Sequence, residues 1–176
     1  MTPLSPVSYL VLGLIDRAGK ATPYDLKQMA ESISGLWALR HDQVYREPDR
    51  LAKLGLLSEE REETGRRRRL FRITDEGRQA LEAWLVTPST EFTELRDIGL
   101  LQLFLGAAPE PLAARQLETH SKRLSEYEGL AKTLTEGTPK AILLALEAGI
   151  GHEREWVRFW RGLLQSSEVE ETKGNR

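Results

Sequence analysis

The segment that most constrains the fold is residues 40–74, RHDQVYREPDRLAKLGLLSEEREETGRRRRLFRIT. Its first part carries the apolar residues Val44, Leu51 and Leu54 at helical spacing, which predicts a helix buried along one side. The positions between them are mostly polar or basic, and a protein core does not accept such side chains unpaired. Gly55 follows directly, where a glycine commonly ends a helix. The pattern therefore predicts an amphipathic helix with a basic outer face that ends at this glycine.

The second part of the same segment has the pattern of a β-hairpin with a strongly basic tip. Residues 56–63 form the first predicted arm, residues 64–65 begin the turn, and residues 68–74 form the return arm. Phe71 and Ile73 alternate with polar neighbours and are expected to face inward. Four consecutive arginines lie at the tip. A helix with a basic outer face beside a basic hairpin is the composition of a winged-helix DNA reader.

Two further helices are predicted ahead of this segment. Ser5 and Thr22 are good N-cap residues, and each is followed by a proline, which suits the first helical position. Apolar stripes at helical spacing continue from both caps. Two short helices, a turn and a third helix make a helix-turn-helix arrangement. A fourth helix is predicted after Thr74, where acidic residues in the first turn favour the helix dipole.

Pro48 lies within the third predicted helix. In a helix interior, proline removes one backbone hydrogen bond and crowds the carbonyl of Val44, at a cost of roughly 3 kcal/mol. A helix that starts near Asp42 would be kinked there, whereas a start nearer Tyr45 would leave the proline in the first turn. The sequence leaves both starts open.

A break at residues 87–90, Thr-Pro-Ser-Thr, predicts a domain boundary. Three helical segments are expected after it: residues 95–105, a long helix to about residue 136, and a last helix over residues 140–165. The fold class is mainly α, with an N-terminal winged helix-turn-helix of three helices plus a β-hairpin and an all-α dimerisation domain. The predicted ranges are the winged-helix domain over 1–88, the helical dimerisation domain over 89–165 and a disordered tail over 166–176, which has no apolar period.

Composition limits the class of protein further. The 176 residues are 40% hydrophobic and 30% charged, as in a folded protein, and their net charge of -2 gives no overall attraction to nucleic acid. DNA binding would have to come from a local basic patch. The chain has no cysteine, which fits a reducing compartment. It has neither an apolar run of membrane-spanning length nor a signal-peptide pattern, so we expect a cytoplasmic protein without a membrane partner.

Several stretches together resemble the PadR family of bacterial transcriptional regulators. They are LVLGLI at residues 10–15, TPYDL at 22–26, QVYREPDRLAKLGLL at 43–57, RRLFRITDEGRQAL at 68–81 and, as a weaker match, LRDIGLLQLFL at 95–105. With the later helices they cover nearly the whole chain, and the order and spacing of the first four are the specific part. The chain departs from the family at Pro23 and Pro48, where many members have glycine and leucine. The resemblance implies a homodimeric winged-helix repressor, often released from DNA when a small molecule binds.

The third helix supplies one set of candidate DNA-binding residues. Gln43, Arg46 and Arg50 are spaced by three and four residues, which places them on one helix face. Glutamine and arginine are the side chains that pair with adenine and guanine edges. The alternative is a solvated helix face, which the adjoining hairpin and the family resemblance disfavour. Tyr45, which resembles a tyrosine of the family, either contacts a phosphate or supports the helix.

The hairpin supplies the other set, Arg66, Arg67, Arg68 and Arg69, expected beside or in the minor groove. Strand alternation sends Arg67 and Arg69 to one side and Arg66 and Arg68 to the other, so only some of them can reach DNA. The alternative is a solvated loop paired with the glutamates of the first arm. Exposed pairs of this kind contribute at most about 1 kcal/mol each, so they would not keep the arginines from a phosphate backbone.

Two long amphipathic stripes in the second half are the candidate dimer interface, since three helices alone make a thin core. The alternative is that both stripes are satisfied within one chain. A two-fold dimer would read a palindromic operator in double-stranded DNA, with half-sites about one turn or a multiple apart. The candidate interface residues are Leu117, Leu124, Tyr127, Leu134, Ile142, Leu146, Ile150, Val157, Trp160 and Leu164.

Aromatic residues near the domain junction and the last helix supply a candidate effector pocket. A small planar aromatic or drug-like ligand could sit among them, and ordinary core packing is the alternative use. The candidate pocket residues are Trp84, Phe92, Phe104, Trp156 and Trp160.

The sequence offers little for catalysis. His41, His120 and His152 are far apart and lack metal-ligand spacing, and His120 is expected to be a packing residue. The turn at residues 64–66 lacks the further glycine and the Lys-Ser/Thr pair of a phosphate loop. We therefore expect no enzyme activity, no cofactor and no metal. The alternative function is a winged-helix module for protein–protein or RNA contact without operator binding.

Overall fold

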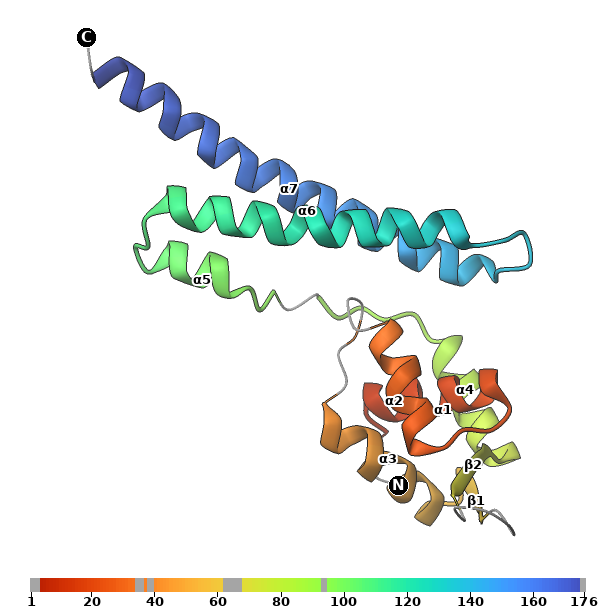
Figure 1. Ribbon diagram of the computed structural model, residues 1–176. Coiled ribbons are helices and arrows are strands. Elements are labelled where there is room, and N and C mark those ends of the chain that lie inside the picture. Colours follow the sequence, from red (N-terminus) through yellow and green to blue (C-terminus); the bar gives the residue numbers. More distant parts are fainter. Residues whose placement is uncertain (1–3, 34–36, 38–39, 62–67, 93–94, 175–176) are drawn as a thin grey trace. The chain divides into compact units, whose positions relative to one another are not determined.

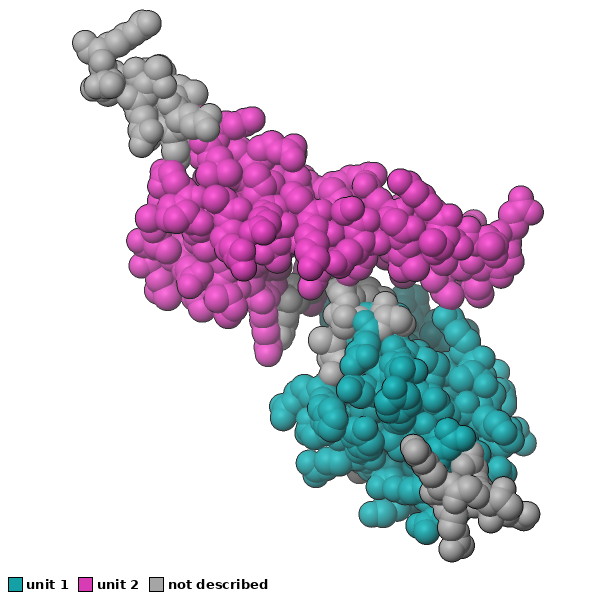
Figure 2. Space-filling view, in the orientation of Figure 1, with its two compact units in different colours: residues 1–91 teal, residues 92–176 magenta. Residues whose placement is uncertain are grey.

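The computed structural model describes residues 4–33, 37, 40–61, 68–92 and 95–174, without the side chains of residues 32 and 166–174. The chain divides into two compact units, Met1–Glu91 and Phe92–Arg176 (Figure 2). We call them unit 1 and unit 2 and describe each by itself. The division falls just after the break at residues 87–90.

Unit 1 is a winged helix. Three helices precede an antiparallel hairpin, and a fourth helix follows it (Figure 1). This order and the mainly helical content confirm the predicted fold class. The elements are α1 (Pro6–Ala18), α2 (Pro23–Ser32), α3 (His41–Lys53), β1 (Leu57–Arg61), β2 (Arg69–Ile73) and α4 (Asp75–Leu85).

Reciprocal caps explain where α1 and α2 begin. The backbone N–H of Ser8 donates to Oγ of Ser5 at 3.2 Å, and the N–H of Ser5 donates to Oγ of Ser8 at 3.0 Å. The N–H of Asp25 donates to Oγ1 of Thr22 at 3.2 Å, and the N–H of Thr22 donates to Oδ2 of Asp25 at 2.9 Å. A proline follows each cap. Both predicted helix starts are confirmed.

Phe71 ties the hairpin to the helical core. Its side chain is fully buried, and its backbone exchanges two hydrogen bonds with Ala21, at 2.9 and 3.0 Å, just before α2. The next residue, Arg72, pairs with Glu60 across the hairpin, so the predicted alternation is confirmed. The buried core of unit 1 consists of Val11, Leu12, Ile15, Ala21, Leu26, Val44, Leu51, Leu56, Leu57, Phe71 and Leu81.

α3 begins at His41, so Pro48 lies in its interior and not in its first turn. Of the two starts that the sequence left open, the earlier one forms. Pro48 is fully buried, and with Val44 and Leu51 it makes the inner face of the helix. The carbonyl of Val44 lacks the backbone donor that a regular helix would supply, while burial of the ring contributes hydrophobic free energy that opposes this cost.

A tight junction joins the hairpin to α4. The hydroxyl of Thr74 accepts the N–H of Gly77 at 3.1 Å and donates to the carbonyl of Gly55 at 2.7 Å. Gly55 itself has a φ of 76°, a left-handed conformation that side chains disfavour. A β-carbon on Gly77 would overlap the carbonyl oxygen of Leu56. The absence of a side chain at Gly77 therefore lets α4 approach the hairpin this closely.

Unit 2 consists of α5 (Ile98–Phe104), α6 (Pro109–Thr133) and α7 (Lys140–Gly174) in the part that the structure describes. α6 and α7 pack against each other as an antiparallel pair (Figure 1). α7 continues to Gly174, beyond the predicted end near residue 165, so the expected tail is helical over most of its length. Residues 166–173 contain neither glycine nor proline, and their glutamates and lysine are good helix formers without an apolar face.

Candidate nucleic-acid interface

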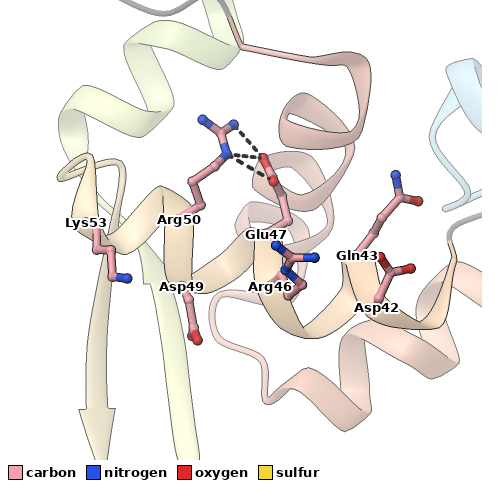
Figure 3. A pocket seen from close by; sticks show the side chains of 7 residues that line it. All are labelled: Asp42, Gln43, Arg46, Glu47, Asp49, Arg50 and Lys53. Carbon is pink, nitrogen blue, oxygen red and sulfur yellow. Dashed lines mark hydrogen bonds and ion pairs between the residues drawn. The ribbon is translucent and has the colours of Figure 1, made fainter.

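The buried face of α3 determines which of its side chains are exposed to solvent. Val44, Pro48 and Leu51 are buried, and the helical period turns most of the positions between them toward solvent. The side chains of the outer face line a concave surface along the helix (Figure 3). The seven residues of this α3 surface are Asp42, Gln43, Arg46, Glu47, Asp49, Arg50 and Lys53.

Each of the three carboxylates on the α3 surface has an arginine partner, with N–O distances of 2.6–3.2 Å. By contrast, Arg46 and Lys53 are exposed and have no ion-pair partner among the described residues. Because the carboxylates are already paired, Arg46 and Lys53 carry the charge that an approaching polyanion would meet. The three ion pairs are Asp42–Arg40, Glu47–Arg50 and Asp49–Arg69.

Gln43 and Tyr45 stand near the start of α3 and have local contacts. Oε1 of Gln43 accepts the backbone N–H of Arg40 at 3.0 Å, which satisfies a donor at the helix start. Tyr45 is 39% exposed, and its ring centroid lies 5.0 Å from that of His41. The DNA contacts of Gln43 and Tyr45 stay predictions.

Arg50 connects α3 to α1. It donates to both carboxylate oxygens of Glu47 (Figure 3) and, through Nη2, to Oγ of the buried Ser8 at 2.8 Å. Hydrogen bonding to Glu47 raises the pKa of Arg50. Burial works to raise the pKa of Glu47, but the hydrogen bonds from Arg50 and Ser8 outweigh it, so that pKa lies below its ordinary value. Arg50, predicted as a base reader, is thus held in an ion pair and by α1.

Arg69 connects the hairpin to α3. Its Nε and Nη2 donate to the two carboxylate oxygens of Glu59 at 2.7 and 2.8 Å, and Nη2 also donates to Oδ1 of Asp49 at 2.6 Å. The guanidinium carbon lies 5.2 Å from the ring centroid of Phe71. Hydrogen bonds to Glu59 and Asp49 raise the pKa of Arg69, and the same hydrogen bond from Arg69 lowers the pKa of Glu59.

The other hairpin arginines are placed only in part. Arg68 is exposed, whereas Arg66 and Arg67 lie outside the described residues, so the predicted alternation of the four stays a prediction. Four of the seven residues of the α3 surface were not predicted, namely Asp42, Glu47, Asp49 and Lys53. Lys53 lies two helical turns after Arg46, so its spacing could have identified it. Asp49 could not be identified in this way, because its partner is on the hairpin.

An aromatic cluster lies between α6 and α7. The rings of Trp156 and Trp160 are 6.2 Å apart, and the ring of His120 is 5.6 Å from that of Trp156. Nδ1 of His120 lies 2.6 Å from Oε2 of Glu153, which is buried. Trp160 is fully buried, and its Nε1 has no hydrogen-bond partner among the described residues. The cluster holds two of the five residues predicted for an effector pocket.

The other three predicted pocket residues have different surroundings. In unit 1, Trp84 stacks on Tyr9 with ring centroids 4.6 Å apart. In unit 2, Phe92 and Phe104 are 99% and 86% exposed. Neither the stacking of Trp84 nor the exposure of Phe92 and Phe104 tests the effector pocket, which stays a prediction.

The residues predicted to form the dimer interface are mostly half-buried by the packing of α6 against α7. Two of them, Val157 and Trp160, are buried inside unit 2 and are not available at its surface. The large apolar side chains that remain exposed in the described part of unit 2 lie before, on and just after α5 and near the adjoining ends of α6 and α7. They are Phe92, Leu95, Ile98, Leu101, Phe104, Leu105, Leu130, Leu143 and Leu144.

Two kinds of feature are absent from the described part of the chain. None of its histidine, aspartate and glutamate side chains form a group of three that could hold a metal ion. None of its helices combines the length and the apolar character needed to cross a membrane.

Fold and surface together define the class, a winged-helix protein with a basic outer face on its third helix. Residues 11–83 match the model of the Transcriptional regulator PadR-like family. The negative transcriptional regulator PadR of Bacillus subtilis (strain 168) is 22% identical over 174 residues, which cover 90% of this chain and 95% of that protein.

Solved structures agree with this match in fold. Bacillus subtilis PadR in complex with operator DNA has a TM-score of 0.80 at 22% identity, covering 93% of this chain and 99% of that chain. The same protein in complex with p-coumaric acid has a TM-score of 0.73 at 22% identity, covering 91% and 97%. The resemblance to the PadR family is confirmed over residues 11–83, which match the family model, and the solved PadR structures share the fold of this chain.

Proposed function

We propose that this protein is a PadR-type transcriptional regulator, a sequence-specific DNA-binding repressor that acts as a homodimer and leaves its operator when a small molecule binds. The observation that carries the proposal is the charge arrangement of the α3 surface. Its carboxylates have arginine partners, which leaves Arg46 and Lys53 as the unpaired cations among its described residues, beside an arginine-rich hairpin. Such a local patch attracts a polyanion although the whole chain has a net charge of -2.

The proposed contacts divide between base edges and phosphates. Arg46 lies on the outer face of α3, and its guanidinium fork suits the O6 and N7 acceptors of guanine in the major groove. Gln43, almost one turn earlier, is the proposed second base reader. Lys53 at the end of the helix is a point charge that suits a phosphate, and the arginines at residues 66–68 have guanidinium forks that suit phosphate oxygens. Arg50 supports α3 through Glu47 and α1 in place of the base contact predicted for it.

The relatives support the two ligands of this proposal. Bacillus subtilis PadR is a negative regulator by name and has been solved with operator DNA and with p-coumaric acid. For this chain we propose duplex DNA as the macromolecular partner and a planar aromatic or drug-like compound as the effector. The operator sequence can be identified by selection from random duplexes, and the effector by titration with candidate compounds.

Dimerisation is proposed to bury the exposed apolar side chains of unit 2. Several such residues, including Leu101, lie on one short helix. Together they expose more contiguous apolar surface than the isolated leucines that are common on the surface of a monomer. Sedimentation equilibrium of the full chain should give a dimer, weakened by Leu101→Ser. The exposed neighbour Gln102 offers a matched control, because Gln102→Ser should leave the dimer intact. A wild-type chain that stays monomeric at micromolar concentration would contradict the proposal.

An effector site is proposed at the aromatic cluster of α6 and α7. The buried Nε1 of Trp160 is an unsatisfied donor among the described residues, and Trp156 offers a partly exposed ring beside it. Titration of tryptophan fluorescence with p-coumaric acid and other planar aromatic compounds should give a saturable change that Trp156→Phe removes. Trp84→Phe, in unit 1, is the control expected to keep it. No saturable response across a broad panel would count against the site.

Selection from random duplexes by the purified protein, followed by footprinting, tests the DNA proposal directly. We expect an enriched palindrome, because two recognition helices related by a two-fold axis read two half-sites. Arg46→Ala should weaken binding to it. Failure to enrich any duplex, or binding insensitive to this change together with a stable protein or RNA partner, would favour the alternative winged-helix module.

A further inference from the structure

Arg69 joins three parts of unit 1 through one guanidinium group. It forms two hydrogen bonds with Glu59 on β1, a third with Asp49 on α3, and lies over the ring of Phe71 in the core. The two carboxylates come from different elements, Asp49 from α3 and Glu59 from β1. An arginine fork held by charge-assisted hydrogen bonds in this way has a defined orientation.

From this geometry we propose that Arg69 is a positioning residue for DNA reading, which fixes the hairpin against α3 and neutralises Asp49. The inference rests on the proposed DNA-binding function. It assigns Arg69 a role other than a DNA contact, which the sequence predicted for only some of the four hairpin arginines. It also assigns Asp49 a role, although a carboxylate on a DNA-reading face would by itself oppose binding.

The contacts of Arg69 explain why it would stay in place when DNA arrives. Moving its guanidinium to a phosphate would break the hydrogen bonds at 2.6–2.8 Å and leave Asp49 and Glu59 as unpaired carboxylates near a polyanion. The side chain is 37% exposed and its ring contact with Phe71 would also be lost. Arg46 and Lys53 have no such internal partners among the described residues, so they can contact DNA without breaking an ion pair within the protein.

The pairing also fixes the distance between the two DNA-facing elements. α3 carries Arg46 and the hairpin carries the arginines at its tip, and both must meet one duplex at the same time. Asp49 follows Arg46 by nearly one helical turn. The ion pair between Asp49 and Arg69 therefore holds the outer face of α3 to the start of β2. A hairpin free to move would have to be ordered on binding, and that ordering lowers affinity.

The positioning role and a phosphate contact predict opposite results for Asp49→Asn. If Arg69 positions the hairpin, loss of the carboxylate weakens binding even though it removes a negative charge from the DNA-facing surface. If Arg69 is instead a phosphate ligand held back by Asp49, the same change releases it and tightens binding. Asn is nearly isosteric with Asp and the position is at the surface, so this variant should fold.

The test is a titration of the selected duplex with full-length protein by fluorescence anisotropy, over a series of salt concentrations. Asp49→Asn and Arg69→Ala should each weaken binding about tenfold or more, the size expected for a hydrogen bond to a charged group. Both should leave the slope of log affinity against log salt unchanged. The double variant should bind no worse than Arg69→Ala alone, because both changes break one link. Lys53→Ala is the control that tests the slope, since removing a charge that neutralises a phosphate lowers it.

The outcomes separate this inference from the function on which it rests. Wild-type protein that binds no duplex at low salt would remove the proposed function and the inference together. Wild-type binding combined with tighter binding by Asp49→Asn, or with a slope reduced by about one in Arg69→Ala, would overturn the positioning role alone. Thermal unfolding of each variant, monitored by circular dichroism, shows that the comparison is between folded proteins.

Discussion

Replacing Gly77 by alanine tests the packing that places the hairpin. Alanine normally stabilises a helix relative to glycine by up to about 1 kcal/mol. Here a β-carbon would overlap the carbonyl oxygen of Leu56 and lie 2.9 Å from Cγ1 of Ile73. The carbonyl of Leu56 cannot withdraw freely, because it accepts the N–H of Thr74 at 3.2 Å. Overpacking against a backbone, with loss of the Thr74 cap, should therefore destabilise unit 1 by about 2–4 kcal/mol.

The assay is urea unfolding of the full chain followed by far-ultraviolet circular dichroism. Gly13 in α1 gives a matched control in the same unit, because a β-carbon there would lie 4.0 Å from Cδ1 of Leu81, an ordinary contact. Gly13→Ala should therefore leave unit 1 as stable as the wild type or stabilise it by up to about 1 kcal/mol. A Gly77→Ala protein as stable as the wild type would refute the reasoning about this junction.

Three further predictions concern the core, acid stability and charge. Phe71→Ala should cost about 3–5 kcal/mol in the free energy of unfolding, and a loss below about 1 kcal/mol in denaturant titrations would count against its central place. Because the pKa of Glu47 is lowered in the folded state, its contribution to stability is present above its unfolded pKa and is lost as pH falls through its folded pKa. Glu47→Gln should therefore lose less stability than the wild type between about pH 6 and pH 3, and equal losses would contradict this. Lys53→Ala should lower the salt slope of operator binding by about one, which anisotropy titrations can measure, and an unchanged slope would exclude a phosphate-neutralising role for Lys53.

Rules that act over a few residues predicted most of unit 1. Ser5 and Thr22 cap helices through partners three residues away, and the alternation around Phe71 is a property of one strand. Such signals are complete within a short window of sequence. The start of α3 was not decided in this way, because burial of Pro48 in the assembled core opposes its local cost.

The charged residues of the candidate site were harder to assign because their partners are distant in the sequence. Arg50 bonds to Ser8, which is 42 positions away, and Arg69 bonds to Asp49, which is 20 positions away. A helical wheel places Arg50 near Arg46, but it contains no information on α1 or on the hairpin. The sequence therefore predicted the exposed face of α3 but could not show which of its arginines are held in ion pairs. Among the described arginines of this surface, Arg46 is the one without an ion-pair partner.

The helices of unit 2 show a different limit. An amphipathic stripe indicates that a helix packs against another surface, but it does not indicate whether that surface belongs to the same chain. Val157 and Trp160 belong to the predicted dimer stripe, and the structure buries both within unit 2. The sequence did not single out Leu101 and placed Phe104 in the candidate pocket, because the exposure of both depends on how α5 packs.

The most direct test of the central claim is the affinity of the wild-type protein for its selected duplex across salt concentration. We propose that a local cluster of cations, doubled by dimerisation, binds DNA although the chain as a whole is slightly acidic. A dimer that neutralises roughly 6–10 phosphates should lose on the order of 10³–10⁵ in affinity between about 50 and 200 mM salt. An affinity that does not change over this range, or no binding at the lowest salt, would contradict the account.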